Sequence, residues 1–385
     1  METVKLYYEN AFLQDFTAVV ESCGAVKGGF AVVLDRTAFY PEGGGQPADH
    51  GTLGDARVLD VHEKDGVVAH LCDRELPVGA EVSGHIDWAR RFDHMQQHSG
   101  EHIVSGMLCS AFHCDNVGFH LGADTVTIDY NADISWEQVL DIERRANRYI
   151  WENHPIHIWY PSPEELAALP YRSKKALEGP VRLTEFPGAD LCACCGTHVS
   201  TTGQVGAIKI LSAQSYKGGT RLAVVCGERA HQSIAAAWQD AAAVGTLLSS
   251  APGRLLPAVQ NLQTAEAALK QRLAAMQNAL SEALAQAAVP GQPAVLHCDG
   301  ADGDGLRRIC LAVSARTNAL TAVLASGGQG LAYALCLPGG DVRPVCKALN
   351  EAFGGRGGGK PGFCQGSLAC TDFADVQNFL VNYHE

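Results

Sequence analysis

The chain has 385 residues, of which 46% are hydrophobic and 18% charged, and its formal net charge is −13. This length predicts two or three domains, with enough apolar residues for buried cores. The N-terminal residues lack a basic region followed by an apolar run, and no apolar stretch reaches about 18 residues, so we expect a cytoplasmic protein without membrane spans. The acidic balance also weighs against a broad surface for nucleic acid, because Lys and Arg normally drive phosphate binding.

Residues 1–88 are predicted to form a small antiparallel β domain, a β-barrel. Apolar and polar positions alternate between turn residues in this region, and this is the period of strands with one buried face. The segments with this pattern are Val4–Tyr8, Phe30–Leu34, Ala56–Val61 and Gly66–Leu71. A glycine-rich segment, Phe39–His50, lies among them.

From Asp87 to about Phe112 the pattern becomes helical and carries a histidine pair. His98 and His102 are four residues apart, so they share one face of the helix. His94 extends the same stripe by one turn and is either a further functional group or a neighbour. Two histidines at this spacing can equally be ordinary packed side chains. A second motif is needed to distinguish a metal site from simple packing.

An α+β pattern follows this helix. Strands are expected at residues 125–130, around 156–159, at 205–211 and at 221–226, with a helix over 135–153 and a short helix after Pro163. Helices packed on an antiparallel sheet are the expected arrangement.

The second motif is Cys194–His198, about ninety residues after the histidine pair. A cysteine and a histidine four apart can converge across a tight loop, and together with the histidine pair they supply the nitrogen and sulfur donors that Zn²⁺ prefers. Cys192 and Cys195 stand beside the motif. Spacing favours Cys194 as the sulfur ligand, and the other two cysteines are alternatives.

After Gly227 the sequence becomes rich in Ala, Leu and Gln and predicts helices ending before Pro290. An alternating four and three spacing, interrupted by Glu266, indicates a helical hairpin or coiled coil and a possible homodimer contact. The positions in this seam are Leu255, Val259, Leu262, Leu269, Leu273, Met276 and Leu280.

Beyond residue 290 short apolar strands, at 319–324 and 331–336, alternate with helical segments and predict a small α/β domain. Gly354–Gly362 is a glycine-rich loop close to a P-loop pattern, but Pro361 stands where a Ser or Thr would hold Mg²⁺, so nucleotide hydrolysis is not expected. Its backbone N–H groups, with Arg356 and Lys360, can instead contact RNA phosphate. The Arg90–Arg91 pair and the stretch with Arg172, Lys174 and Lys175 are further basic patches.

Several of these stretches, taken in chain order, resemble one family. His98–His102 (HSGEH) and Cys194–Val199 (CCGTHV) are similar to the HxxxH and CxxxH signature of the editing domains of alanyl-tRNA and threonyl-tRNA synthetases and of the free-standing AlaX proteins. Phe39–His50 resembles the glycine-rich segment before the alanyl-type editing domain, and Arg182–Asp190 resembles the approach to the CxxxH loop. Gly354–Gly362 is similar to the glycine-rich signature of the DHH-associated domain that ends alanyl-tRNA synthetases.

The resemblance implies an α+β protein of four parts. We expect a β-barrel-like domain with a glycine-rich loop at 1–88 and a zinc editing domain at 89–227. A helical hairpin spacer at 228–289 and a DHH-associated-like α/β domain at 290–385, which contacts the tRNA elbow, complete the expected chain.

The resemblance also implies ATP-independent hydrolysis of tRNA(Ala) wrongly charged with serine, or with glycine. A synthetase pocket sized for alanine excludes these two residues poorly, so a second, hydrolytic site multiplies the discrimination. Zn²⁺ is the expected cofactor, and its expected ligands are His98, His102, Cys194 and His198. The candidate substrate-binding residues are Gly43, Gly44, Gly45, Gln46, Asn116, His120 and Thr125.

Glu101 is the candidate catalytic base, and it also keeps a second enzymatic interpretation open. HSGEH satisfies H-x-x-E-H, the inverted zinc-peptidase motif in which the glutamate activates the metal-bound water. Such peptidases complete their site with a downstream carboxylate, whereas this chain offers Cys194 and His198. A third interpretation is a tRNA-binding protein with a structural zinc site, because four protein ligands normally fill a tetrahedral ion.

Overall fold

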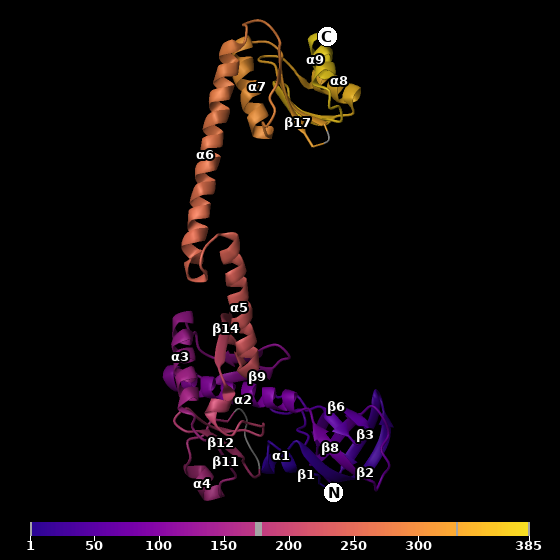
Figure 1. Ribbon diagram of the computed structural model, residues 1–385, viewed down its shortest axis with the longest axis vertical. Helices are drawn as coiled ribbons and strands as arrows, with labels where there is room; N and C mark the ends of the chain where they lie inside the picture. Colours follow the sequence, from indigo (N-terminus) through magenta and orange to yellow (C-terminus); the bar gives the residue numbers. More distant parts are fainter. Residues whose placement is uncertain (1, 174–178, 329, 384–385) are drawn as a thin grey trace. The chain divides into compact units, whose positions relative to one another are not determined.

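The computed structural model describes residues 2–173, 179–328 and 330–383 (Figure 1). Contacts divide the chain into two compact units, Met1–Ala242 and Ala243–Glu385. Both units mix helices with sheets, so the predicted α+β class is confirmed. Among the described residues, every helix is too short or too polar to span a lipid bilayer.

The N-terminal part of the first unit is a closed barrel in the strand order β2-β3-β7-β6-β5-β8 (Figure 1). Its strands are β2 (Asp15–Val26), β3 (Gly29–Leu34), β5 (Gly51–Leu53), β6 (Ala56–Lys64), β7 (Val67–Cys72) and β8 (Glu81–Ile86). Alternate side chains of these strands fill the interior with an apolar cluster. Three barrel strands, β2, β5 and β8, are absent from the sequence prediction.

The strand predicted over residues 4–8 is wrong beyond its first two residues. Only β1 (Val4–Lys5) is extended, and it pairs in parallel with β4 (Arg36–Thr37). The next four residues form the short helix α1 (Leu6–Glu9), closed by a hydrogen bond from the Asn10 N–H to the Leu6 carbonyl. Tyr7 is thereby buried, with 1% of its surface exposed.

The centre of the first unit is an antiparallel sheet with two long helices packed on it. The sheet order is β14 (Ile208–Tyr216), β15 (Gly219–Cys226), β10 (Val126–Tyr130) and β9 (Asn116–Leu121). α2 (Trp88–Phe112) begins where the Asp87 side chain accepts a hydrogen bond from the Arg90 N–H. α3 (Trp136–Glu152) begins with a Ser135 capping box and ends at left-handed Asn153, within one residue of its predicted limits.

A three-stranded sheet, β11 (His157–Trp159), β12 (Leu183–Phe186) and β13 (Asp190–Ala193), completes this region. The short helix α4 (Pro163–Ala168) lies between β11 and β12 in the sequence, and the 3₁₀ turn η1 (Thr202–Val205) follows β13. The CxxxH motif directly follows β13, so the sheet fixes the start of that loop.

Helix α5 (Gly227–Leu247) begins in the first unit and ends in the second, and η2 (Pro252–Arg254) follows it. In the second unit, α6 (Leu255–Ala287) precedes a sheet in the order β16-β17-β18-β20-β19. The sheet strands are β16 (Ala294–His297), β17 (Thr321–Gly327), β18 (Gly330–Cys336), β19 (Arg356–Lys360) and β20 (Phe363–Leu368). The other helices are α7 (Gly303–Thr317), α8 (Arg343–Phe353) and α9 (Phe373–Val381).

The sheet of the second unit differs from the sequence interpretation in one respect. The core of the glycine-rich segment is the edge strand β19, paired antiparallel with β20, and not a loop. Glycines lack the alternation of side chains by which a strand is recognised in a sequence. The extended conformation of β19 is therefore evident only from its pairing with β20. Only β16 and β17 are parallel neighbours in this sheet.

Candidate active site and metal centre

The two histidine motifs converge at one point of the first unit. One ligand atom each from His98, His102, Cys194 and His198 lies within 4.8 Å of the other three. The Cys194 Sγ is 3.3 Å from the His198 Nε2 and 3.6 Å from the His98 Nε2. The three imidazoles are at most 3% exposed, so these polar groups face one another in an interior site.

Each of the three histidines is oriented through its other ring nitrogen. The Nδ1 of His98 is 2.9 Å from the Gln46 Oε1, and the Nδ1 of His102 is 2.8 Å from the Asp190 Oδ2. The Nδ1 of His198 is 3.2 Å from the Ser99 Oγ. Such partners fix the ring orientation of metal-binding histidines.

The electrostatics of the cluster favour metal-binding protonation states. Burial alone raises the pKa of the Cys194 thiol, but the surrounding imidazoles, with a hydrogen bond from His102, outweigh burial and hold this pKa well below 9.0. Burial lowers the pKa of His198 to about 3. A thiolate and a neutral imidazole are the forms that coordinate metal ions.

His102 behaves differently. Burial lowers its pKa, but the Cys194 thiolate and the Asp190 carboxylate outweigh that effect and hold the pKa well above 6.5. A cation on His102 therefore balances the cysteine charge until a metal ion takes over that role. Three nitrogens and one sulfur at these distances fit a divalent ion that accepts mixed donors.

The CxxxH loop is shaped by close contacts. A Cβ added at Gly196 would lie 2.2 Å from the His98 Cε1, so only glycine fits between the two motifs. The Arg182 guanidinium donates hydrogen bonds of 2.9 Å to the carbonyls of Cys194 and Gly196. Cys195 is exposed and lies outside the metal-binding group, whereas Cys192 is buried beside His102 and Asp190 in a second possible ligand group.

Asp190 in that second group already has partners. It accepts two hydrogen bonds of 2.7 Å from Arg172 and contacts the His102 Nδ1. The Asp190 carboxylate therefore fixes the orientation of the His102 ring through its Nδ1. Of the two possible ligand groups, the one formed by His98, His102, Cys194 and His198 is therefore the better metal site.

A cavity of about 540 Å³ opens beside the cluster. The Phe119 ring forms one wall and stacks on His98, with ring centroids 5.0 Å apart. Gly45, at φ +88°, lies so close that an added Cβ would be 2.6 Å from the Phe119 ring. The cavity is lined by Gly44, Gly45, His98, Glu101, His102, Val117, Gly118, Phe119, Arg172, Ser173, Cys192, Ala193, Cys194, Cys195 and Gly196.

The sequence-predicted substrate residues divide into three groups. Gly44 and Gly45 line this cavity, whereas Gly43 lies next to them and pairs with Gln46 through two backbone hydrogen bonds. Gln46 and Asn116 are buried behind the lining, the first against His98 and the second against Glu101. The structure does not place the other two, His120 and Thr125, in the cavity lining.

His120 misses the cavity because of strand parity. It belongs to β9, in which neighbouring side chains point to opposite faces, and Phe119 takes the cavity face. His120 is exposed, while Thr125 lies in the turn before β10 and accepts a hydrogen bond from the Gly122 N–H through its carbonyl. Parity cannot be assigned from a sequence segment whose strand has not been recognised.

Glu101 lies at the cavity wall, 2% exposed. Its Oε1 accepts hydrogen bonds from the Ser105 hydroxyl at 2.7 Å and from the Asn116 amide at 2.5 Å. Its Oε2 is 4.0 Å from the His102 Nε2. The carboxylate is thus held beside the metal-facing nitrogen of a candidate ligand.

Three residues that support the site were not assigned to it from the sequence: Ser99, Arg172 and Asp190. Two of them stood inside motifs that had been noticed, because Ser99 belongs to HSGEH and Asp190 ends the segment before the CxxxH loop. Their roles depend on contacts between distant segments, which no local spacing reveals.

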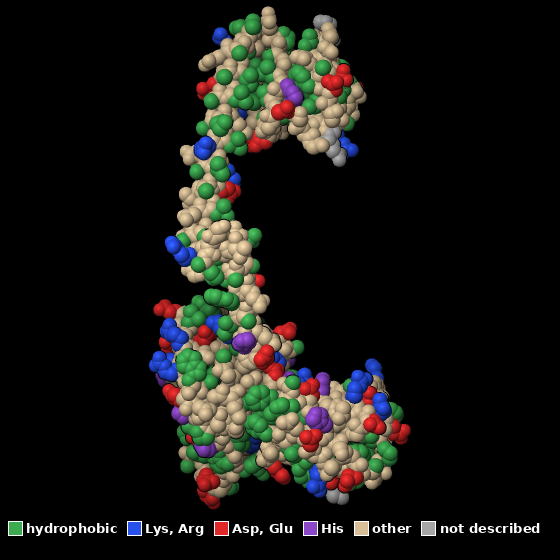
Figure 2. Space-filling model, in the orientation of Figure 1, with side chains coloured by type: hydrophobic (Ala, Val, Ile, Leu, Met, Phe, Trp, Pro, Cys, Tyr) green, Lys and Arg blue, Asp and Glu red, His purple; other side chains and the backbone are tan. Residues whose placement is uncertain are grey.

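The three predicted basic patches differ in the structure. Arg172 is bound to Asp190, and Lys174 and Lys175 lie outside the described residues. Arg91 is fully buried in an ion pair with Asp49 and hydrogen bonds to backbone carbonyls, so it is unavailable to RNA. Arg356 and Lys360 are the first and last residues of β19, and both are exposed. On the barrel face seen in Figure 2, Lys and Arg alternate with Asp and Glu and form no single basic field.

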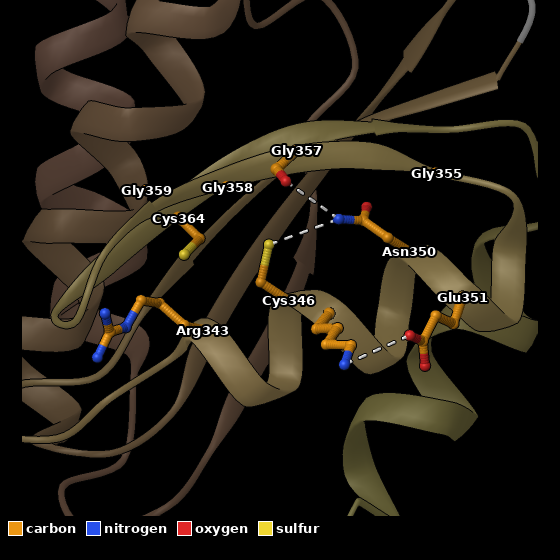
Figure 3. Close-up of a pocket in the computed structure, with 10 residues that line it drawn as sticks. Arg343, Cys346, Asn350, Glu351, Gly355, Gly357, Gly358, Gly359 and Cys364 are labelled. Atoms are coloured by element: carbon orange, nitrogen blue, oxygen red, sulfur yellow. Dashed lines mark hydrogen bonds and ion pairs between the residues drawn. The ribbon is translucent and has the colours of Figure 1, made fainter.

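A second cavity, of about 510 Å³, lies in the second unit between β19 and α8. Figure 3 shows Gly357, Gly358 and Gly359 passing over the α8 side chains. The Asn350 amide donates to the Gly357 carbonyl at 3.3 Å and to the Cys346 sulfur at 3.7 Å. The absence of side chains on these glycines leaves the strand backbone accessible.

Comparison with known proteins agrees with this geometry. Residues 2–90 match the family model for class II (A) tRNA synthetases, and residues 181–223 match that for the threonyl and alanyl tRNA synthetase second additional domain. The chain is 31% identical over 347 residues to the alanyl-tRNA editing protein Aarsd1-B of Xenopus laevis, covering 88% of this chain and 84% of that protein.

Two archaeal proteins show the same relationship. The chain is 33% identical over 236 residues to the alanyl-tRNA editing protein AlaX-L of Pyrococcus horikoshii, covering 59% of this chain and 58% of that one. It is 33% identical over 389 residues to an alanine–tRNA ligase of Pyrobaculum neutrophilum, covering 94% of this chain and 42% of the ligase. Because the Xenopus match extends over most of both chains, this chain belongs to the alanyl-tRNA editing protein family.

Proposed function

We propose that the protein is a trans-editing hydrolase that removes serine, and secondarily glycine, from mischarged tRNA(Ala) in the cytoplasm. The observation that carries the proposal is the convergence of His98, His102, Cys194 and His198 on a cavity of about 540 Å³ in a chain of this family. A cavity of this size suits an aminoacyl group together with part of its terminal nucleoside.

We assign Zn²⁺ to the four converging side chains, because their donor atoms suit that ion and because the thiolate of Cys194 and the neutral imidazole of His198 are metal-binding forms. When bound, zinc would supply Lewis-acid polarisation of the ester or of a water molecule. Gln46, Ser99 and Asp190 hold the imidazole rings in orientation through their second nitrogens. Phe119 covers one side of His98 and limits the access of bulk water.

Glu101 is our candidate for the general base. It lines the cavity, and two hydrogen bonds fix its carboxylate beside His102. The peptidase alternative loses support because the nearby carboxylate of Asp190 is held by Arg172 behind the cluster. A Glu101→Gln protein that binds zinc normally but hydrolyses ester far more slowly would support the base assignment.

The remaining parts have roles that follow from their position in sequence and their surfaces. We assign the barrel with Gly43–Gln46 (residues 1–88) to the acceptor end of the tRNA and residues 89–227 to catalysis. Residues 228–289 form the helical spacer, and the α/β domain at 290–385 contacts tRNA phosphates through Arg356 and Lys360. The apolar seam of α6 is our candidate for a homodimer contact, since Leu269, Leu273 and Met276 are 61%, 54% and 68% exposed.

One experiment tests the central claim. The purified protein is incubated with tRNA(Ala) carrying serine, glycine or alanine, with and without a zinc chelator, and release of each amino acid is measured. We expect zinc-dependent release of serine, slower release of glycine and retention of alanine. Tight tRNA binding without release of any amino acid would instead support the structural-zinc alternative.

A further inference from the structure

A separate cavity of about 400 Å³ is lined by Pro47, which follows the glycine-rich loop, and by His94, one helical turn before His98. The hydrogen bond of 3.0 Å from the Leu121 N–H to the Gly45 carbonyl joins the loop to β9. Gly45 lines the metal-site cavity, whereas Pro47, two residues after Gly45, and Gly122, the residue after Leu121, line the new one. Its lining residues are Pro47, Ala89, Arg90, Asp93, His94, Gly122, Ala123 and Arg229.

The cavity carries a net positive charge. Arg229 is paired with the one acidic side chain of the lining, Asp93, through hydrogen bonds of 2.9, 3.1 and 2.5 Å, and donates a further bond of 2.8 Å to the Gly122 carbonyl. Among the described residues, Arg90 has no such acidic partner. Its Nε donates a hydrogen bond of 3.0 Å to the Ala48 carbonyl. The terminal N–H groups of Arg90 are therefore available to an anion.

His94 supplies the second observation. It is 2% exposed and lines the cavity, and its buried Nδ1 has no hydrogen-bond partner in the described chain. It lies one helical turn before His98, on the same face of α2. Burial, and then the neighbouring Arg90 and Arg229 charges, lower its pKa to about 3, so it is a neutral group. A buried ring nitrogen without a partner is costly unless a ligand or water completes the site.

We propose that this cavity binds a backbone phosphate near the 3′ end of the tRNA, a step that rests on the function proposed above. The charge of Arg90 and its planar donor set suit a phosphate oxygen pair. An enzyme that places a terminal ester in one cavity must also bind the preceding nucleotides, and the two cavities are lined by neighbouring residues of the same two segments, 44–47 and 117–122.

The aromatic rings of an adjoining cavity favour RNA over free phosphate as the source of the anion, although the lining of that cavity also carries the carboxylates of Asp93, Asp124 and Glu228. It shares Ala89, Asp93, Ala123 and Arg229 with the phosphate cavity. Its wall includes the rings of Trp88 and Phe92, whose centroids are 5.5 Å apart. Aromatic rings beside a phosphate-binding arginine can stack unpaired bases, as at the single-stranded end of a tRNA.

Kinetics on two substrates test the proposal. Arg90→Gln is compared with wild type and with Arg144→Gln, an exposed arginine on α3. Ser-tRNA(Ala) carries the phosphate, and the seryl ester of adenosine does not. We expect Arg90→Gln to raise KM about tenfold for the tRNA, with kcat unchanged and with unaltered hydrolysis of the adenosine ester. Equal effects on both substrates, or none, would overturn the proposal.

Binding measurements separate this proposal from the proposed function, since they require no hydrolysis. An uncharged acceptor-stem hairpin with a CCA end is titrated into wild type, Arg90→Gln and His94→Phe, with zinc content as the check on the neighbouring metal site. We expect both variants to bind the hairpin more weakly, and Arg90→Gln to reduce the slope of log Kd against log salt by about one.

Inorganic phosphate distinguishes the two sources of the anion. If the cavity serves RNA, millimolar phosphate should compete with the hairpin on wild type and not on Arg90→Gln. Phosphate binding that depends on Arg90 while hairpin affinity does not would show a small-anion site and contradict the RNA assignment.

Discussion

The Oε1 of Gln46 lies 2.9 Å from the Nδ1 of His98, although the two residues are 52 positions apart. Gln46 also ties the second motif to this contact. Its Oε1 accepts from the Thr197 N–H at 3.2 Å, and its Nε2 donates to the Thr197 Oγ1 at 2.8 Å. The glycine-rich segment that follows β4 is therefore part of the candidate metal site, because one buried amide connects the helix motif with the loop motif.

This relationship predicts that Gln46→Ala weakens zinc binding 10- to 100-fold, the usual effect of losing an outer hydrogen bond to a histidine ligand. The measurement is competition with a chromophoric chelator, followed by deacylation at saturating zinc. Gln214→Ala, on an exposed position of β14, is the control. An unchanged zinc affinity in Gln46→Ala would mean that the contact has no part in metal binding.

A second prediction concerns Gly196. An added Cβ would lie 2.2 and 2.3 Å from two atoms of the His98 ring, so Gly196→Ala must displace that ring or the loop. We expect loss of most bound zinc and most activity while the circular dichroism spectrum is kept. Gly24→Ala is the matched control, because a Cβ there meets nothing within 4 Å. Full zinc occupancy in Gly196→Ala would show that the CxxxH loop and His98 are not in close contact at Gly196.

A third prediction separates the neighbouring cysteines. Cys194 lies among three imidazoles that stabilise its thiolate, whereas the pKa of Cys195 is raised by burial and by the Cys194 charge. Cys194→Ala should lose stoichiometric zinc and esterase activity, and Cys195→Ala should keep both. Zinc content by atomic absorption decides the question. Full zinc content in Cys194→Ala would mean that the sulfur ligand is Cys192 or Cys195.

A fourth prediction tests the seam of α6. Apolar positions at 4/3 spacing with large exposed areas are expected to pair with a second copy. Leu273→Lys should shift the protein to monomer in sedimentation velocity at micromolar concentration. Gln271→Lys changes an exposed position of the same helix outside the seam and should leave the association unchanged. A wild-type protein that sediments as a monomer would remove the proposed contact.

The sequence predicts the ligand set because both motifs depend on local geometry. A helical repeat places His98 and His102 on one face, and a tight loop brings Cys194 towards His198. Contacts across long separations, such as Gln46 with His98 or Asp190 with Arg172, have no local signal. Arg91 illustrates the same limit, since its charge suggested an RNA patch and only its neighbour Asp49 shows that it is an interior ion pair.

A fifth prediction follows from His70, a fully buried histidine of the barrel. Its Nε2 is 2.8 Å from the Thr37 Oγ1 and its Nδ1 is 3.0 Å from the Val32 carbonyl, and burial lowers its pKa from 6.5 to about 4. Between pH 6.5 and about 4 the unfolded chain binds a proton that the folded chain does not. Stability should therefore fall as the pH falls through this window, by about 3 kcal/mol for this group.

Urea unfolding of the whole chain from pH 7 to 4.5 measures this effect. His70→Gln keeps an amide in place of the imidazole and should lose part of the pH dependence, even if its stability at pH 7 is lower. His157→Gln, at an exposed position of β11, should follow the wild-type curve. Because His94 and His198 are present in all three proteins, their own titration cancels in the comparison. An identical pH slope for His70→Gln and wild type would show that His70 does not titrate on unfolding.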